Sequence, residues 1–208
     1  MNNSTINSTT QQLDASTIRR LDASTIILHV CCAVCAAACA ERLRSEGEEP
    51  LLFFSNSNIA PKAEYDKRLE AARTLASAWD LELVEDIYDH QAWLEAVKGY
   101  ENEPEKGRRC PVCFDFSFAR TAAFARERGI SAFTSTLTVS PHKISRMVFA
   151  AGGKYPEFRN YDFKKKDGFK RCVILSRELG LYHQHYCGCE FSLRDMNIKK
   201  GRSDHGPK

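Results

Sequence analysis

The chain has 208 residues, of which 43% are hydrophobic, and its formal net charge is +3. This length suits one compact domain with short extensions, and so small a charge does not by itself identify a nucleic-acid partner. No stretch approaches the roughly 20 apolar residues that a membrane-spanning helix needs, so we expect no membrane association. The nearest candidate for an export signal, 26–40, is short and is interrupted by His29 and by two adjacent cysteines, which argues against secretion.

Nine cysteines are the unusual feature of the composition. An odd number cannot pair completely within one chain. A protein without an export signal is expected in the reducing cytoplasm, where clustered cysteines indicate metal or redox chemistry. We therefore predict a cytoplasmic protein whose cysteines serve a function.

Composition also divides the chain into segments. Residues 1–24 are rich in Ser, Thr, Asn and Gln and contain the sequence LDASTI twice, at 13–18 and 21–26. This predicts a disordered leader. Residues 25–196 are predicted to form a single α/β domain, and 197–208 a flexible basic tail.

Within this domain, predicted strands and helices alternate. The short apolar runs that predict strands are 26–30, 51–55, 81–86 and 132–137. The helices predicted between them are 35–47, 61–79, 91–99 and 114–128, with a charged loop at 101–109. This alternation predicts a parallel sheet in a three-layer α/β sandwich. Beyond Ser140 the sequence becomes basic and loop-rich with one helix near 173–179, and we interpret it as an extension packed over the site.

The first candidate site lies at the end of the first predicted strand. Ligands of open parallel sheets bind at the carboxyl ends of the strands, and Cys31 and Cys32 directly follow Val30. A second pair, Cys110 and Cys113, has the CxxC spacing that is common in zinc and iron–sulfur sites. Adjacent cysteines are awkward ligands for one tetrahedral ion because their side chains diverge, whereas a four-iron cluster offers each thiolate its own iron. The two pairs together therefore favour a [4Fe–4S] cluster over structural zinc.

Cys187 and Cys189 form a third pair, separated by one glycine. A disulfide between them would close a small, strained ring and would be readily reduced, so the pair could relay two electrons. The alternative is a zinc site, because His183, His185, Cys187 and Cys189 alternate and would share one face of an extended strand. The spacing leaves both interpretations open.

The remaining cysteines are Cys35, Cys39 and Cys172. A buried free cysteine behaves as a small hydrophobic residue, so we expect Cys39 and Cys172 to pack in the core. Cys35 is open to either role because it lies one helical turn from the adjacent pair.

Residues 142–171 combine basic and aromatic side chains. They contain nine Lys or Arg against three acids, with five Phe or Tyr between 155 and 169. Lys and Arg neutralise phosphates, and aromatic rings stack on unpaired bases. A solvated basic loop whose aromatic rings belong to the core would have the same pattern, and the segment alone does not separate the two.

Five motifs together resemble one family. They are LHVCCA at 28–33, RCPVCF at 109–114, TLTVSPHK at 136–143, YDFKKKDG at 161–168 and LYHQHYCGCEFS at 181–192. In this order they resemble the motifs of the QueH family, the epoxyqueuosine reductases that do not use cobalamin. The resemblance spans about residues 26–194.

This resemblance implies a Rossmann-like fold of the adenine nucleotide α-hydrolase type and the last step of queuosine biosynthesis. The epoxide of epoxyqueuosine at the tRNA wobble position would be reduced to the alkene, with electrons from an unidentified donor. By position, Cys31, Cys32, Cys110 and Cys113 would hold the [4Fe–4S] cluster, and Cys187 and Cys189 would be a redox-active pair. A second metal ion, iron, is implied beside the cluster, with Asp162 as its candidate ligand.

Two rival functions follow from the same sequence. An ATP-dependent tRNA-modifying enzyme of this fold class needs a Gly-rich phosphate loop after the first strand, and residues 31–35 contain no glycine. A zinc-stabilised RNA-binding module without catalysis is the other rival. Metal analysis separates it from an iron–sulfur enzyme.

Overall fold

The computed structural model describes residues 23–203, with side chains described as far as residue 198. Apart from its last two residues, the predicted leader lies outside the described residues, as do residues 204–208 of the predicted tail. Within the described range, no helix is both long enough and apolar enough to cross a membrane.

A four-stranded parallel sheet forms the centre of the domain. Its strands are β1 (Thr25–His29), β2 (Glu49–Phe54), β3 (Leu83–Glu85) and β4 (Phe133–Ser135), in the order β3-β2-β1-β4. In the central strands, Leu28 of β1 lies opposite Leu52 of β2 and Thr134 of β4. Both central strands are covered on their two faces, which explains their nearly continuous apolar sequences.

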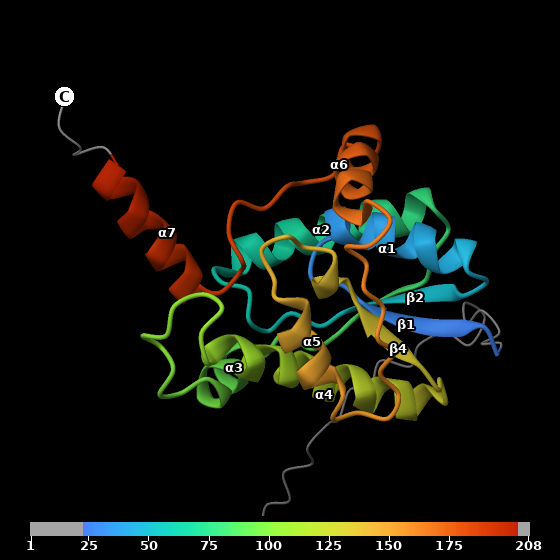
Figure 1. Cartoon of the computed structure of the whole chain (residues 1–208), viewed down its shortest axis with the longest axis horizontal. Helices are drawn as coiled ribbons and strands as arrows, with labels where there is room; N and C mark the ends of the chain where they lie inside the picture. Colours follow the sequence, from blue (N-terminus) through green and yellow to red (C-terminus); the bar gives the residue numbers. More distant parts are fainter. Residues whose placement is uncertain (1–22, 204–208) are drawn as a thin grey trace, which may run out of the picture.

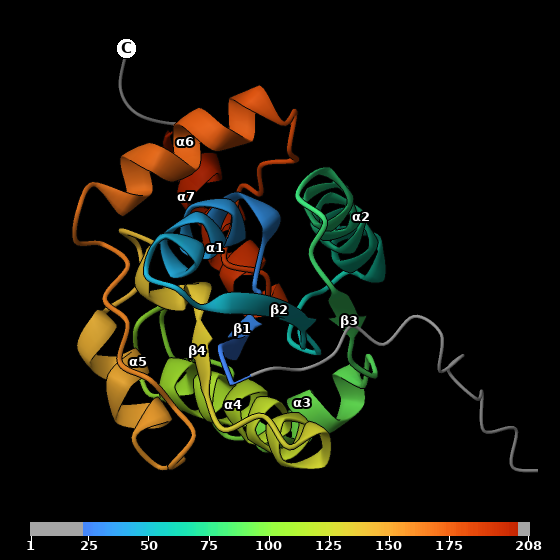
Figure 2. The ribbon, with the colours of Figure 1, turned by 90° about the vertical axis from the view of Figure 1, so that its right-hand side faces the viewer.

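Helices cover both faces of this sheet (Figures 1 and 2). On one face lie α1 (Ala33–Ser45), α2 (Lys62–Ala78) and α6 (Gly168–Glu178). On the other lie α3 (His90–Ala96), α4 (Arg109–Arg128) and α5 (Ser145–Gly152). The predicted three-layer α/β sandwich is confirmed.

Helix α1 is the central helix of its layer. Its sequence, AVCAAACAERLRS, is rich in alanine, the best helix former, and its small side chains let it pack closely between the sheet and α6. Cys39 and Cys172 are fully buried in this packing, as predicted. The first turn of α1, which carries Cys35, therefore rests on a closely packed support.

The start of α4 differs from the prediction in a way that matters for the site. The helix begins at Arg109, so Cys110 and Cys113 lie on its first turns and the predicted charged loop ends earlier. The buried Arg109 guanidinium donates to the carbonyl oxygens of Tyr100, Glu101 and Glu103. These contacts hold the preceding loop against the start of the helix.

Two helices were not predicted from the sequence. Helix α5 follows the 3₁₀ turn at Thr136–Thr138 and packs Val148 and Ala151 against Phe158. Helix α7 (Glu190–Ser203) begins directly after the Cys187-Gly-Cys189 segment and extends into the predicted tail. In Figure 1 it projects away from the sandwich on the side of α3.

Candidate functional site

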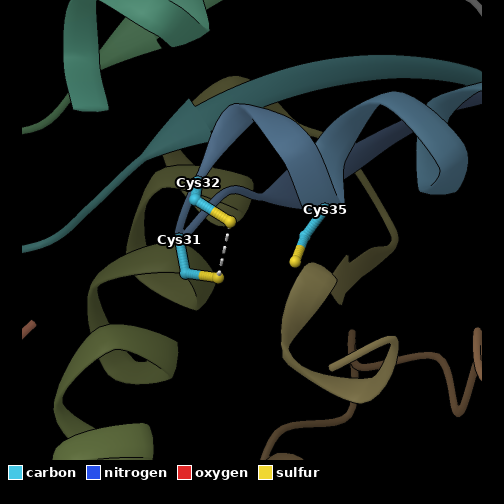
Figure 3. A group of neighbouring side chains, drawn as sticks. All are labelled: Cys31, Cys32 and Cys35. Atoms are coloured by element: carbon cyan, nitrogen blue, oxygen red, sulfur yellow. Dashed lines mark hydrogen bonds between the residues drawn. The ribbon is translucent and has the colours of Figure 1, made fainter. Parts of the chain in front are cut away.

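Three thiols converge where β1 meets α1. Cys31 follows the strand, Cys32 caps the N-terminus of α1, and Cys35 lies in the first turn of that helix. Their sulfur atoms all lie within 4.8 Å of one another, and those of Cys31 and Cys32 are 4.0 Å apart (Figure 3). Among the described residues, they are the group of three or more Cys, His, Asp or Glu whose geometry suits a metal ion.

Hydrogen bonds from neighbouring strands fix this group. The backbone N–H of Cys31 donates to Thr136 Oγ1 over 3.1 Å, and the Thr136 hydroxyl lies 3.2 Å from the Cys31 sulfur. Asn56 Nδ2 donates to the carbonyl of Val30 over 2.7 Å. Below the thiols, buried His29 joins Ser135 Oγ to the carbonyl of Ser55. Residues that follow β2 and β4 thus hold the backbone at Val30 and Cys31 in place.

The three thiols share charge unequally. The pKa of Cys32 is lowered because the thiols of Cys31 and Cys35 hydrogen-bond to its sulfur. The pKa of Cys31 is raised to about 11, mainly because it donates to Cys32. Contact with Cys172, then with Cys31 and Cys32, raises the pKa of Cys35. The thiol whose pKa is lowered, Cys32, stands at the N-terminus of α1, where the macrodipole also favours a thiolate.

The other two cysteine pairs, Cys110 with Cys113 and Cys187 with Cys189, form a second group. Cys113 of α4 and Cys189 pack around the buried ring of Trp93. Burial, followed by the charges of Cys187 and Cys189, raises the pKa of Cys113. The sulfur of Cys110 is buried and accepts a hydrogen bond from the Lys106 backbone N–H over 3.2 Å.

A cavity of about 430 Å³ joins the two groups of thiols. Its wall contains one member of each predicted pair, together with Cys35: the thiols are Cys31, Cys35, Cys113 and Cys187. Cys32, Cys110 and Cys189 are buried next to these residues. The cavity wall thus contains one member of each predicted pair. The sulfurs that lie within 4.8 Å of one another are those of Cys31, Cys32 and Cys35, and this group does not include Cys110 or Cys113. The structure adds Cys35, whose position one turn after Cys32 was the available signal.

The segment that carries Cys187 is anchored by Arg68, which sequence reasoning missed. Arg68 is 2% exposed, pairs with Glu64 over 2.8 Å, and donates to the carbonyl oxygens of Tyr186 and Cys187 over 3.1 and 3.0 Å. Gly188 has φ of +139°, and a Cβ there would lie 3.2 Å from Arg68 Nη1. Glycine is therefore required both by the backbone conformation and by the close approach of Arg68. The i,i+4 pair of Glu64 and Arg68 was visible in the sequence but resembles an ordinary surface pair.

Two predicted ligand assignments receive no support from the geometry. The Asp162 carboxylate accepts from the Lys164 backbone N–H, and Asp162 lies neither in the cavity wall nor in the three-thiol group. The alternative zinc site would need His183 and His185 to lie together with Cys187 and Cys189. His183 Nε2 lies 2.7 Å from Ser176 Oγ of α6, whereas His185 lines the cavity. The four alternating residues do not converge, so the zinc interpretation is not favoured.

The aromatic residues of the basic segment serve mainly in the core. Phe158 and Phe163 are buried, and Tyr161 stacks on Phe163 with ring centroids 5.3 Å apart. Arg42 of α1 lies over both stacked rings. Phe169 is the exception, being 43% exposed. Several basic residues of the segment are also engaged, because Lys143, Lys154, Lys166 and Arg171 each pair with a carboxylate. Most of these rings pack against the protein instead of presenting a surface for stacking on bases.

The donor set fits an iron–sulfur cluster. Several cysteine sulfurs and no described carboxylate group converge at the metal-suited positions, and soft thiolates favour iron–sulfur clusters and zinc. The Trp93 indole N–H is buried with no nitrogen or oxygen acceptor in the described structure, and it lies beside the Cys113 sulfur. A thiolate bound to a cluster is a suitable acceptor for such a donor.

Comparisons with known proteins identify the family of this chain. The family model described as "Epoxyqueuosine reductase QueH" matches residues 26–195. Proteins of that name from Acinetobacter baylyi and Histophilus somni are 38% and 36% identical over 85% and 83% of this chain, covering 84% and 73% of their own lengths. The one from Thermotoga maritima is 37% identical over 84% of this chain and 93% of its own. The chain therefore belongs to the epoxyqueuosine reductase QueH family.

Proposed function

We propose that this protein reduces epoxyqueuosine to queuosine in tRNA. The observation that carries the proposal is the cavity whose wall contains Cys31, Cys35, Cys113 and Cys187, because it joins the metal-suited thiols to the CxC pair in one reaction space. Family membership supports the substrate, since the relatives are named for this reaction. The chemistry is a net two-electron, two-proton reduction that removes the epoxide oxygen as water.

In this proposal Cys31, Cys32, Cys110 and Cys113 hold a [4Fe–4S] cluster. When bound, the cluster supplies low-potential electrons one at a time. A second metal ion beside it remains a proposal. Cys35 is better placed than Asp162 as its ligand, because its sulfur is within 4.8 Å of the sulfurs of Cys31 and Cys32.

Cys187 and Cys189 act in this proposal as the redox-active pair. Arg68 holds the Cys187 carbonyl against α2, and this fixes the segment so that the Cys187 sulfur faces the cavity. Cys189 is buried behind it, with burial raising its pKa. The pair accepts electrons as a disulfide and returns them as thiols.

The cavity also suits a nucleobase of tRNA. Its volume is in the range of small-ligand sites, and a modified base reaches such a site after extrusion from its stack. The Lys, Arg and His side chains in the cavity wall are His29, Arg68, Lys106, His142, Lys143 and His185, and of these Lys106, His142 and His185 are exposed. Exposed groups of this kind attract the phosphates that flank the extruded base.

Anaerobic turnover tests the function directly. The reconstituted protein is incubated with tRNA containing epoxyqueuosine and a low-potential reductant, and the nucleosides are identified by mass spectrometry. We expect conversion to queuosine. A Cys187→Ser/Cys189→Ser variant should lose turnover with its iron content and visible absorption unchanged, and Cys39→Ser is the matched control because Cys39 is buried in the packing of α1 away from the cavity wall. Absence of product with fully loaded wild-type protein would refute the proposal.

A further inference from the structure

Lys143 is a buried cation in the wall of the cavity. Its side chain is 10% exposed, and its Nζ lies 2.6 Å from the Cys187 sulfur and 3.1 Å from Glu105 Oε1. Its backbone carbonyl accepts a hydrogen bond from Lys164 Nζ. The residue is thus held at both its backbone and its charged end.

The ammonium group of Lys143 can donate one more hydrogen bond than it makes. It carries three N–H bonds, and two of them are directed to Cys187 and Glu105. No third acceptor for Nζ is present among the described residues, and the side chain lines the cavity. By contrast, Arg68, the other buried cation in the wall, donates to Glu64 and to two backbone carbonyls.

Charge at Lys143 is maintained by its neighbours. Burial disfavours the ammonium ion, but the charges of Cys187 and Glu105 and the hydrogen bond to Cys187 outweigh this and raise its pKa. Cys110 of α4 contributes in the same direction. Lys106, His142 and His185 also line the cavity. Lys143 is therefore protonated at neutral pH, and it gives up its proton only to an oxygen that is more basic than its own amine, such as the alkoxide that forms as the epoxide opens.

We propose that Lys143 is the proton donor to the oxygen that leaves the substrate. This inference rests on the proposed function. Two electrons from a low-potential one-electron reductant enter the two epoxide carbons, which form the π bond of the alkene. Both C–O bonds break with their electron pairs on oxygen, and the oxygen takes one proton from Lys143 Nζ and one from water to leave as water. Glu105, which is 36% exposed, then relays a proton from solvent back to Lys143.

Two substitutions at Lys143 separate proton donation from charge alone. Lys143→Met removes both, while Lys143→Arg keeps the positive charge on a group that does not release its proton. In single-turnover reactions with excess reduced protein, we expect both variants to form queuosine at least ~100-fold more slowly than wild type. Iron content, visible absorption and affinity for the tRNA should stay unchanged. A Lys143→Arg variant that reacts at the wild-type rate would overturn proton donation.

Glu105→Gln keeps the proposal testable if the Lys143 variants do not fold. Because Lys143 is already charged before the first turnover, the single-turnover rate should stay within a few-fold of wild type, whereas the multiple-turnover rate should fall. If Glu105→Gln lowers the single-turnover and multiple-turnover rates equally, or lowers neither, Glu105 does not return a proton to Lys143. Failure of the proposed function is a different result: the wild-type protein itself would then form no queuosine, and the inference would fall with it.

Discussion

The anchor formed by Arg68 makes a quantitative prediction. Arg68→Met removes the partner of Glu64, which is 9% exposed and retains only the hydroxyl of Tyr182 as a hydrogen-bond donor among the contacts described. Removing one member of a buried ion pair costs ~3–5 kcal/mol, because the other charge is left uncompensated. At about 2–4 °C per kcal/mol for a domain of this size, the midpoint of thermal unfolding should fall by ~6–20 °C.

The partner variant Arg68→Met/Glu64→Gln provides the control. It removes the stranded carboxylate, so it should be more stable than Arg68→Met alone although it carries more changes. Circular dichroism melts measure both effects, and alkylation of Cys187 followed by mass spectrometry reports on the anchored segment. We expect faster alkylation in both variants, because each loses the two hydrogen bonds to the carbonyls of Tyr186 and Cys187. A single variant as stable as wild type would refute the role of the pair, and unchanged alkylation would refute the anchor.

Three further predictions concern groups around the thiols. Trp93→Phe removes a buried N–H beside Cys113. Since hydrogen bonds to sulfur stabilise a reduced cluster, the midpoint potential of the proposed cluster should fall in an EPR-monitored titration of the reconstituted protein, and an unchanged potential would contradict the contact. Burial lowers the pKa of His29 below 6.5, so as the pH falls through that value the unfolded chain binds a proton before the folded chain does. The free energy of unfolding of wild type should therefore fall in this range more than that of His29→Gln. Urea denaturation at a series of pH values measures both, and parallel pH profiles of the two proteins would contradict the prediction. Gly188→Ala places a methyl group 3.2 Å from Arg68 Nη1 at a φ of +139°, and it should expose Cys187 to alkylation more than Gly180→Ala, where a Cβ meets no atom within 4 Å.

The parts of the fold that were predicted correctly depend on local pattern. The runs that became β1 and β2 are apolar except for one polar residue each, His29 and Ser55, and the observed strands lie within two residues of the predicted ends. The start of α4 was missed because it depends on Arg109 reaching the carbonyls of a loop six to nine residues earlier. Helix α5 is short and has no side-chain cap, and its position depends on the ring of Phe158, which approaches Gly152 too closely for any side chain.

The site shows the same division. Spacing identified the three cysteine pairs because each pair is local in sequence. It could not identify the contacts that orient them: Arg68 and Cys187 are 119 residues apart, and Lys143 and Cys187 are 44 residues apart. In the sequence, Arg68 and Lys143 both stand among polar residues, as surface residues do. Their burial becomes visible only in the folded chain.

The position of Cys187 argues that the segment after Ser140 is part of the site and not an accessory to it. Its backbone is held by Arg68 from α2, while its sulfur is held by Lys143 from the loop before α5. Helices α2 and α5 belong to the two different helix layers (Figure 2). A shift of either layer would move the sulfur relative to the cavity that it shares with Cys31 and Cys113. Substitutions in either layer should therefore disturb the same thiol. The cavity therefore depends on contacts from both layers, because its cysteines come from three distant parts of the chain.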